Sequence, residues 1–318
     1  MSKIKLGRTQ LQVSKAGLGC GGHSRLGQGY GESHAHSVNV VRAAMDLGVN
    51  FIDTAKVYGT ETIVGDAVTG RRDQIVLSSK GQIIKPDSPP LGDDFISADD
   101  LEKSLDDSLK NLKTDYLDVY HLHGIMPHQY DICIDRFLPV LKDAQKAGKI
   151  RFIGITERFI HDPSHEMLQK ALSDNYWDVV MVGFNMVNPS ARKTVFPLTQ
   201  ENDVGVLNMF AVRNALGNPQ NMLSLLQRLA EEGHLSMEEA ARRELVDELI
   251  EATFSGSLTE AAYRFCVFEQ GNQVVLTGTG KIDHLRRNVD AISKPALDQN
   301  LLDRLETAFG HINTVSGE

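Results

Sequence analysis

The fold of this chain is most strongly constrained by eight short apolar runs that alternate with segments of helical periodicity. Because the residues of each run are mostly apolar, both faces of the resulting strand are expected to be buried, which is typical of parallel sheets covered by helices. The runs cover residues 16–22, 50–55, 75–80, 116–123, 152–157, 179–185, 205–211 and 274–280. Eight strand–helix units with no linker between two halves predict an α/β fold, the (β/α)8 TIM barrel.

The segments around these runs fit the same fold. Residues 97–112 repeat leucine at helical spacing after a serine and acidic residues, a pattern typical of a capped amphipathic helix. Residues 4–13 form two alternating segments around a Gly-Arg-Thr turn and predict an N-terminal β-hairpin. Three more helix-like segments lie between the seventh and eighth runs, at residues 219–232, 236–254 and 259–269. We therefore expect one domain, residues 1–318, with a helical insertion between strands 7 and 8.

Charge and cysteine content narrow the class of protein. The formal net charge of −9 argues against a nucleic-acid partner and against an anionic membrane surface. Cys20, Cys133 and Cys266 are widely spaced and form no C-x-x-C pair, so neither a zinc site nor a disulfide framework is expected. The sequence has no signal-peptide pattern and no apolar stretch near the ~20 residues of a membrane span. We expect a cytoplasmic protein without a bound metal; the sequence makes no prediction about its oligomeric state.

Residues 17–22 (GLGCGG) match the dinucleotide-binding pattern G-x-G-x-x-G. In a Rossmann domain this pattern opens a helix, and an acidic residue follows about twenty positions later. Here a glycine-rich loop follows instead of a helix start, which argues against that domain. Two alternatives remain: a first barrel strand whose glycines let the backbone approach a ligand, or a structural turn.

Four polar side chains stand where a barrel places its active site, at or just after the ends of successive strands. Asp53, Lys80 and His123 lie at the ends of the second, third and fourth runs, and Tyr58 lies in the loop after the second. Each has an ordinary alternative role: a helix cap, a solvated charge, a core histidine or a packed ring. Their combination at one rim of one barrel indicates a catalytic site.

The chemistry of the four side chains suits carbonyl reduction. That reaction places a hydride on carbon and a proton on oxygen, and Tyr58 can supply the proton although a free tyrosine has a pKa of ~10. The ammonium of Lys80 favours the phenolate and is expected to lower this pKa. Asp53 can hold Lys80 charged and in place, and His123 can hydrogen-bond the substrate oxygen.

These motifs resemble those of the aldo-keto reductase family. The resemblance rests on residues 51–59 (FIDTAKVYG) with Glu61, residues 76–80 (VLSSK), residues 114–123 (TDYLDVYHLH), residues 151–156 (RFIGIT), and the hairpin with residues 17–19. It implies a (β/α)8 barrel that binds an extended nicotinamide cofactor across its strand ends and interconverts an aldehyde, ketone or sugar with an alcohol. It further implies Asp53, Tyr58, Lys80 and His123 as the catalytic residues.

The resemblance also implies where the nicotinamide lies. The family usually has Ser-Asn after strand five, where this chain has Thr156 and Glu157. Glu157 cannot donate when ionised, but it can accept from the carboxamide NH2 group. Met181 stands where the family usually has glutamine. Met209 or Phe210 stands where it has a stacking aromatic ring, although either side chain can equally belong to the core.

At the adenosine end, residues 278–288 (GTGKIDHLRRN) resemble the family's phosphate-binding segment. A helix N-terminus after Gly278, Thr279 and Gly280 suits an anion, but the basic residue common at position 278 is missing. The sequence therefore leaves NADP and NAD both open, with NADP marginally favoured by the family. The candidate cofactor contacts are Gly22, Thr156, Glu157, Met181, Met209, Phe210, Ala211, Arg213, Gly278, Thr279, Gly280, Lys281, His284, Arg287 and Asn288.

Two other functions are weighed against this one. His121 and His123 have the H-x-H form of a barrel metallohydrolase, but the later strand ends lack the further ligands that such a site needs. A non-catalytic NADP(H)-binding regulatory subunit is possible on the same fold, although the intact set of four residues argues against it. The substrate, a small carbonyl compound or sugar, depends on rim loops at residues 23–33, 83–95, 125–130 and 214–256, and the direction of the reaction stays open.

Overall fold

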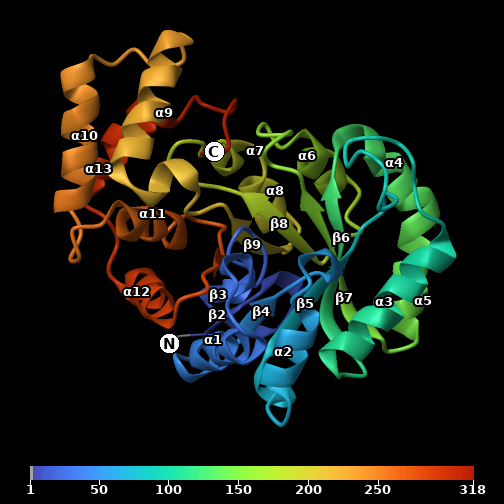
Figure 1. Ribbon diagram of the computed structural model, residues 1–318. Helices are drawn as coiled ribbons and strands as arrows, with labels where there is room; N and C mark the ends of the chain where they lie inside the picture. Colours follow the sequence, from blue (N-terminus) through green and yellow to red (C-terminus); the bar gives the residue numbers. More distant parts are fainter. Residues whose placement is uncertain (1–2) are drawn as a thin grey trace.

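Eight parallel strands close into a barrel in the computed structural model, which describes residues 3–318 (Figure 1). In order around the barrel they are β3 (Ala16–Gly19), β4 (Phe51–Asp53), β5 (Val76–Gly81), β6 (Leu117–Ile125), β7 (Ile150–Glu157), β8 (Val179–Gly183), β9 (Gly205–Met209) and β10 (Val274–Thr277). Strand β10 pairs in parallel with both β9 and β3, which closes the barrel. Each of the eight predicted runs overlaps one barrel strand, so the predicted (β/α)8 fold is confirmed.

The predicted N-terminal hairpin is present and lies under the barrel. Its strands β1 (Lys3–Lys5) and β2 (Gln12–Ser14) pair antiparallel around a 3-10 turn at Gly7–Thr9. The hairpin's buried Leu6, Leu11 and Val13 form one apolar cluster with inward-facing strand residues. The barrel members of that cluster are Phe51, Val76, Val119, Val179, Met181, Leu207 and Val274. Because this plug occupies the end where the strands begin, only the opposite end is left to hold a ligand.

An outer ring of helices covers the barrel (Figure 1). Its helices are α1 (His34–Asp46), α2 (Glu61–Val68), α3 (Ala98–Leu112), α4 (Tyr130–Ile132), α5 (Leu138–Lys146), α6 (Glu166–Ser173), α7 (Ala191–Thr194), α8 (Phe196–Glu201) and α12 (Ile282–Ser293). Helix α3 begins with the predicted capping box, in which Ser97 and Asp100 each bond the other's backbone amide. Among residues 3–318, no helix has the length and apolar character needed to span a bilayer.

The predicted insertion between β9 and β10 consists of α9 (Pro219–Glu231), α10 (Glu239–Glu251) and α11 (Leu258–Val267). Helix α11 is buried along nearly all of its length and packs on α12 and β10, so it completes the outer ring. Helices α9 and α10 stand to one side of the barrel together with α13 (Gln299–Phe309) (Figure 1). Helices α9, α10 and α13 therefore form a helical subassembly beside the barrel (Figure 1).

Candidate active site

The buried centre of the candidate site is an ion pair between neighbouring strands. Lys80, in β5, donates from Nζ to Asp53 Oδ2 at 2.6 Å and to the carbonyl oxygen of Thr54 at 2.8 Å. The other carboxylate oxygen of Asp53, at the end of β4, accepts from Ser78 Oγ at 2.9 Å. Both charged side chains are almost completely shielded from solvent. The ammonium is thus fixed by two acceptors and cannot turn toward water.

Tyr58 and His123 lie above this pair. Tyr58 ends the 3-10 turn Lys56–Tyr58 that follows β4, and its hydroxyl lies 3.3 Å from His123 Nε2. The two rings meet edge to face with centroids 5.5 Å apart, and Lys80 Nζ lies 5.0 Å from the centre of the Tyr58 ring. The structure therefore brings all four predicted catalytic residues together.

The glycine run at residues 17–22 makes room for this arrangement. A Cβ atom on Gly21 would lie 2.7 Å from the Tyr58 ring, and one on Gly17 would lie 2.7 Å from the side chain of Val274. The run enters 3-10 turns at Arg25–Tyr30 and not the helix that a Rossmann domain would need. Its glycines thus permit close approach within a barrel strand, with Gly21 directly under the tyrosine.

Burial and charge set the protonation of the site. Burial raises the pKa of Tyr58 above its ordinary value, although the Lys80 ammonium acts in the opposite direction. The predicted lowering of this pKa by Lys80 is therefore present but outweighed. Burial also lowers the pKa of His123 far below its usual range, and the charges of Lys80 and Arg158 lower it further. At neutral pH the site presents a protonated phenol beside a neutral imidazole.

His121 lies on β6, two residues before His123, and it is buried inside the barrel. It is fully buried, and its ring fills the space that a side chain at Gly154 would need, since a Cβ there would lie 2.1 Å from His121 Nδ1. Burial lowers the pKa of His121 well below its usual value, as do Lys80 and His123. Within residues 3–318, no group of three or more His, Cys, Asp or Glu side chains is arranged to hold a metal ion.

A cavity of about 540 Å³ opens at the carboxyl ends of the strands, directly over Asp53 and Tyr58. It runs across the ends of β8, β9 and β10 and reaches the loops that follow β3 and β9. Six of the predicted cofactor residues line it: Gly22, Met181, Met209, Phe210, Arg213 and Gly278. The cavity joins these residues to Asp53 and Tyr58 of the catalytic set, and its position over the strand ends is the one that the barrel fold favours.

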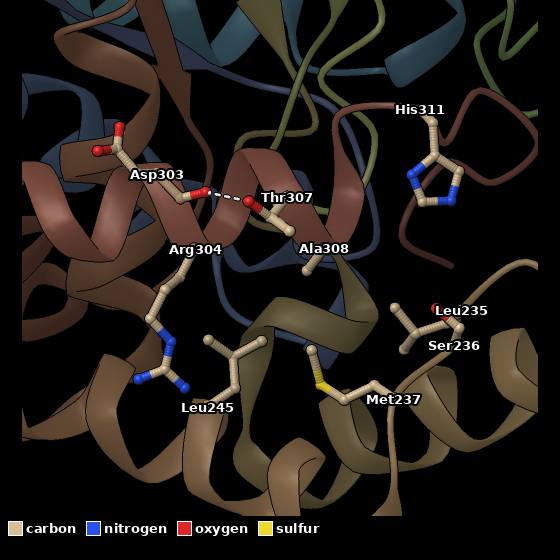
Figure 2. Close-up of a pocket in the computed structure, with 9 residues that line it drawn as sticks. All are labelled: Leu235, Ser236, Met237, Leu245, Asp303, Arg304, Thr307, Ala308 and His311. Atoms are coloured by element: carbon tan, nitrogen blue, oxygen red, sulfur yellow. Dashed lines mark hydrogen bonds between the residues drawn. The ribbon is translucent and has the colours of Figure 1, made fainter.

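A second pocket, of about 350 Å³, lies in the helical subassembly (Figure 2). Leu245 of α10, residues of the preceding loop and one side of α13 line it, with Thr307 Oγ1 donating to the carbonyl of Asp303. Its lining, within residues 3–318, includes none of the four predicted catalytic residues. The barrel cavity, which is lined by Asp53 and Tyr58, is therefore the candidate active site.

Thr156 and Glu157 are buried at the end of β7, and both have protein partners. Thr156 Oγ1 accepts from the backbone amide of Gly124 at 2.7 Å. The Glu157 carboxylate lies 2.9 and 3.0 Å from His165 Nδ1 and accepts from the backbone amide of Gly183 at 2.7 Å. Neither residue is among those that line the cavity within residues 3–318. Thr156 pairs with Met181 across β7 and β8, so the two residues lie beside the other nicotinamide candidates while their polar atoms bond the protein.

The predicted phosphate segment divides into structural and exposed parts. Thr279 Oγ1 accepts from the Lys281 amide, the Gly280 carbonyl accepts from His36 Nε2, and Asn288 donates to Thr277 Oγ1. These bonds hold the junction between β10 and α12. Ala211, two residues after the end of β9, is buried. In contrast, the side chains of Lys281, His284 and Arg287 are exposed at the start of α12. Burial, with the charges of Arg287 and Lys281, lowers the pKa of His284, so Lys281 and Arg287 are the cationic side chains of this group.

Two residues of the site were not anticipated from the sequence. Ser78 orients the Asp53 carboxylate, and Gly21 leaves room for the Tyr58 ring. Ser78 stands two residues before Lys80 in the same strand, so period-two alternation alone places it on the same inward face. Gly21 belongs to the glycine run at residues 17–22, but no local signal shows that its neighbour is Tyr58, which lies on a different strand–loop unit.

Comparison with known proteins agrees with this geometry. The profile of the Aldo/keto reductase family matches residues 18–308. The chain belongs to this family. The aldo-keto reductase AKR11C1 of Bacillus halodurans, in its holo form, has a similar structure, with a TM-score of 0.75, 25% identity and complete coverage of both chains.

Two similar proteins are named for reactions of sugars. The chain is 28% identical over 330 residues to L-galactose dehydrogenase of Arabidopsis thaliana, covering 99% of this chain and 98% of that one. It is 34% identical over 166 residues to 6-dehydroglucose reductase of Novosphingobium aromaticivorans, covering 48% of this chain and 50% of that one. The family membership makes this aldo/keto reductase an oxidoreductase of a small carbonyl substrate.

Proposed function

We propose that this aldo/keto reductase interconverts a carbonyl compound and an alcohol by hydride transfer with NADP(H) or NAD(H), and that Tyr58 is its general acid and base. The observation that carries the proposal is the contact of Tyr58, which lines the barrel cavity, with His123 above the buried Asp53–Lys80 pair. This chemistry needs a hydride, which the cofactor would carry, and one proton donor beside the carbonyl oxygen.

In the reducing direction, a bound nicotinamide would supply the hydride. Tyr58 donates its proton to the substrate oxygen as negative charge develops there. Lys80 stabilises the phenolate that remains, since its ammonium faces the ring and is held by Asp53. The neutral His123 offers a hydrogen bond to the same oxygen and so orients the substrate. In oxidation the same groups act in reverse, with the Tyr58 phenolate accepting the proton.

The residues along the cavity suit an extended dinucleotide. Met181, Met209 and Phe210 give an apolar wall near Tyr58, which fits a nicotinamide ring. Among the described residues that line the cavity, Arg213 is the one arginine, and it fits a diphosphate. The exposed Lys281, His284 and Arg287 fit a further phosphate on the adenosine. We propose that these residues hold the cofactor; the last three allow NADP without excluding NAD.

The first test is a fluorescence titration of the protein with NADPH and NADH. Binding of one or both with a dissociation constant in the micromolar range supports the proposal, whereas binding of neither contradicts it. Stopped-flow oxidation of the bound cofactor with a panel of aldehydes, ketones and aldoses then tests catalysis. Binding without turnover of any carbonyl would favour the non-catalytic regulatory subunit.

A sugar-like substrate is the class we propose to test first. The cavity rim carries several uncharged polar side chains, Ser24, Asn214, Asn218 and Asn221, which can hydrogen-bond hydroxyl groups. Two of the similar proteins are named for reactions of sugars. A panel in which each aliphatic aldehyde is paired with a hydroxylated aldehyde of equal length measures this preference directly as a ratio of kcat/KM values.

The pKa directions of Tyr58 and His123 predict the pH profile. Reduction requires the phenol, so kcat/KM for reduction should stay level up to pH ~10 and fall only above it, because burial raises the pKa of Tyr58. Oxidation requires the phenolate, so kcat/KM for oxidation should rise as the pH increases toward and above ~10. Since the pKa of His123 is strongly lowered, no inflection is expected near pH 6.5 in either direction. A fall in reduction below pH ~7 would contradict the neutral imidazole.

A further inference from the structure

Glu157 and His165 form a fully buried pair beside the candidate site. The Glu157 carboxylate, at the end of β7, lies within 3.0 Å of His165 Nδ1 and accepts a 2.7 Å hydrogen bond from Gly183 N, at the end of β8. His165 directly precedes α6 and has a left-handed backbone, with φ of +63°. The Glu157 carboxylate therefore connects the ends of β7 and β8 with the residue that precedes α6.

An aromatic side chain rests on this pair. The Phe159 ring stacks on the His165 ring with centroids 5.2 Å apart and an angle of 11° between the planes. It also covers Gly183, where a Cβ atom would lie 2.1 Å from the ring. Phe159 is buried, and its edge-to-face contact on the other side is with Phe210, at 5.6 Å and 82°. The pair is thus connected through Phe159 to a residue that lines the cavity.

Phe210 is held in an unusual conformation. Its φ of +66° is left-handed, which is costly for a residue with a bulky side chain and persists only where neighbours enforce it. Its carbonyl accepts from Asn185 Nδ2 at 3.1 Å, and the guanidinium of Arg213 lies 4.5 Å from its ring centre. The Phe159 ring packs against the Phe210 ring as well, so its removal would take away one of the contacts that hold Phe210.

We propose that Glu157, His165 and Phe159 are positioning residues that hold Phe210 in place as one wall of the nicotinamide half of the cofactor cavity. This inference rests on the proposed function, since it presupposes that the cavity takes a nicotinamide dinucleotide. It assigns Glu157 a role through other side chains, in place of the direct contact with the carboxamide that its sequence position suggests.

Dissociation constants of the whole cofactor and of its adenosine half test this proposal. Phe159→Leu and Glu157→Ala are expected to weaken binding of NADPH or NADH about three- to tenfold, the value of one aromatic contact. Both variants should leave the dissociation constant of 2′,5′-ADP or ADP within about twofold, because those fragments lack the nicotinamide. Glu157→Gln should stay close to the wild type, since its amide oxygen can accept from both His165 and Gly183.

Matched comparisons separate positioning from general damage. Phe196→Leu makes the same change at another buried ring, which packs on Phe184 outside the barrel cavity. This control should lower the melting temperature without changing cofactor affinity. In a Phe210→Leu background, the further change Phe159→Leu should have almost no effect on cofactor affinity, because the residue that it positions is gone. This cycle still decides the proposal if Glu157→Ala fails to fold.

Several outcomes would overturn the proposal. Parallel weakening of the adenosine fragments would indicate collapse of the whole cavity, and an unchanged cofactor affinity with a lowered melting temperature would indicate a purely structural pair. The 3-acetylpyridine analogue of the dinucleotide lacks the carboxamide NH2 group. If the loss in Glu157→Ala disappears with this analogue, Glu157 contacts the carboxamide directly. If the wild type binds no dinucleotide, the proposed function itself fails.

Discussion

Replacing Tyr58 with phenylalanine is expected to lower kcat for carbonyl reduction about 100- to 10,000-fold, the usual contribution of a positioned general acid. The substitution removes one oxygen and keeps the ring, which packs over Gly21 and faces Lys80. Because the proton donor is lost while the cavity keeps its shape, the effect should fall on kcat. The dissociation constant of the nicotinamide cofactor should stay nearly unchanged. Steady-state kinetics and fluorescence titration measure the two quantities separately.

Tyr176→Phe provides the matched control for this experiment. Tyr176 is exposed on the protein surface, where Lys142 lies over its ring, and it takes no part in the candidate site. The same loss of a hydroxyl group there should leave kcat at the wild-type value. An unchanged rate in Tyr58→Phe would remove Tyr58 from its proposed role, and a large loss of cofactor affinity would reassign it to binding.

The barrel could be predicted from the sequence because its signals are local and repeated. Each strand is a short apolar run, and helices such as α3 carry their capping residues next to their periodic leucines. Helix α2 was not predicted from the sequence, and it carries Gly65 on its buried face. The structure explains this glycine, since a Cβ atom there would lie 2.5 Å from the backbone oxygen of Asn111 in α3. Such close helix packing depends on a distant segment and leaves no local pattern.

The catalytic set could be predicted for a related reason: parallel strands end at one rim, so residues at strand ends converge there. Lys80 and Asp53 meet across the β4–β5 pair as this rule requires. The partner that a side chain at a strand end contacts could not be predicted in the same way. Glu157 has a partner in His165, eight residues later, in a loop whose left-handed backbone has no clear sequence signal. The rim position was therefore predictable, but the partner was not.

The direction of the pKa shift of Tyr58 could not be predicted from the sequence either. The presence of an ammonium near the tyrosine follows from strand order, and the structure contains it. The extent of burial around the hydroxyl does not follow from strand order. It depends on the packing of Gly21, His123 and the loop after β4, and it outweighs the effect of Lys80. Opposing contributions of similar size can be compared only when the distances and the burial are known.

Removal of the Lys80 charge is expected to have the largest effect on stability. In Lys80→Met the Asp53 carboxylate stays buried without its cation, and breaking a buried pair in this way typically costs about 3–5 kcal/mol. Urea unfolding should show this loss in the free energy of unfolding. Activity should also fall strongly, because no positive charge then stabilises the Tyr58 phenolate.

The double variant Asp53→Asn/Lys80→Met separates these two effects. Asparagine carries no charge and keeps an oxygen that can accept from Ser78, so no unpaired ion is left in the barrel and most of the lost stability should return. Activity should not return, because the ammonium is still absent. As a control, Lys146→Met breaks an exposed pair with Asp143 and should cost at most about 1 kcal/mol. Lys80→Met as stable as the wild type would contradict the expected cost of an unpaired buried carboxylate, because Asp53 would then have taken up a proton in the variant.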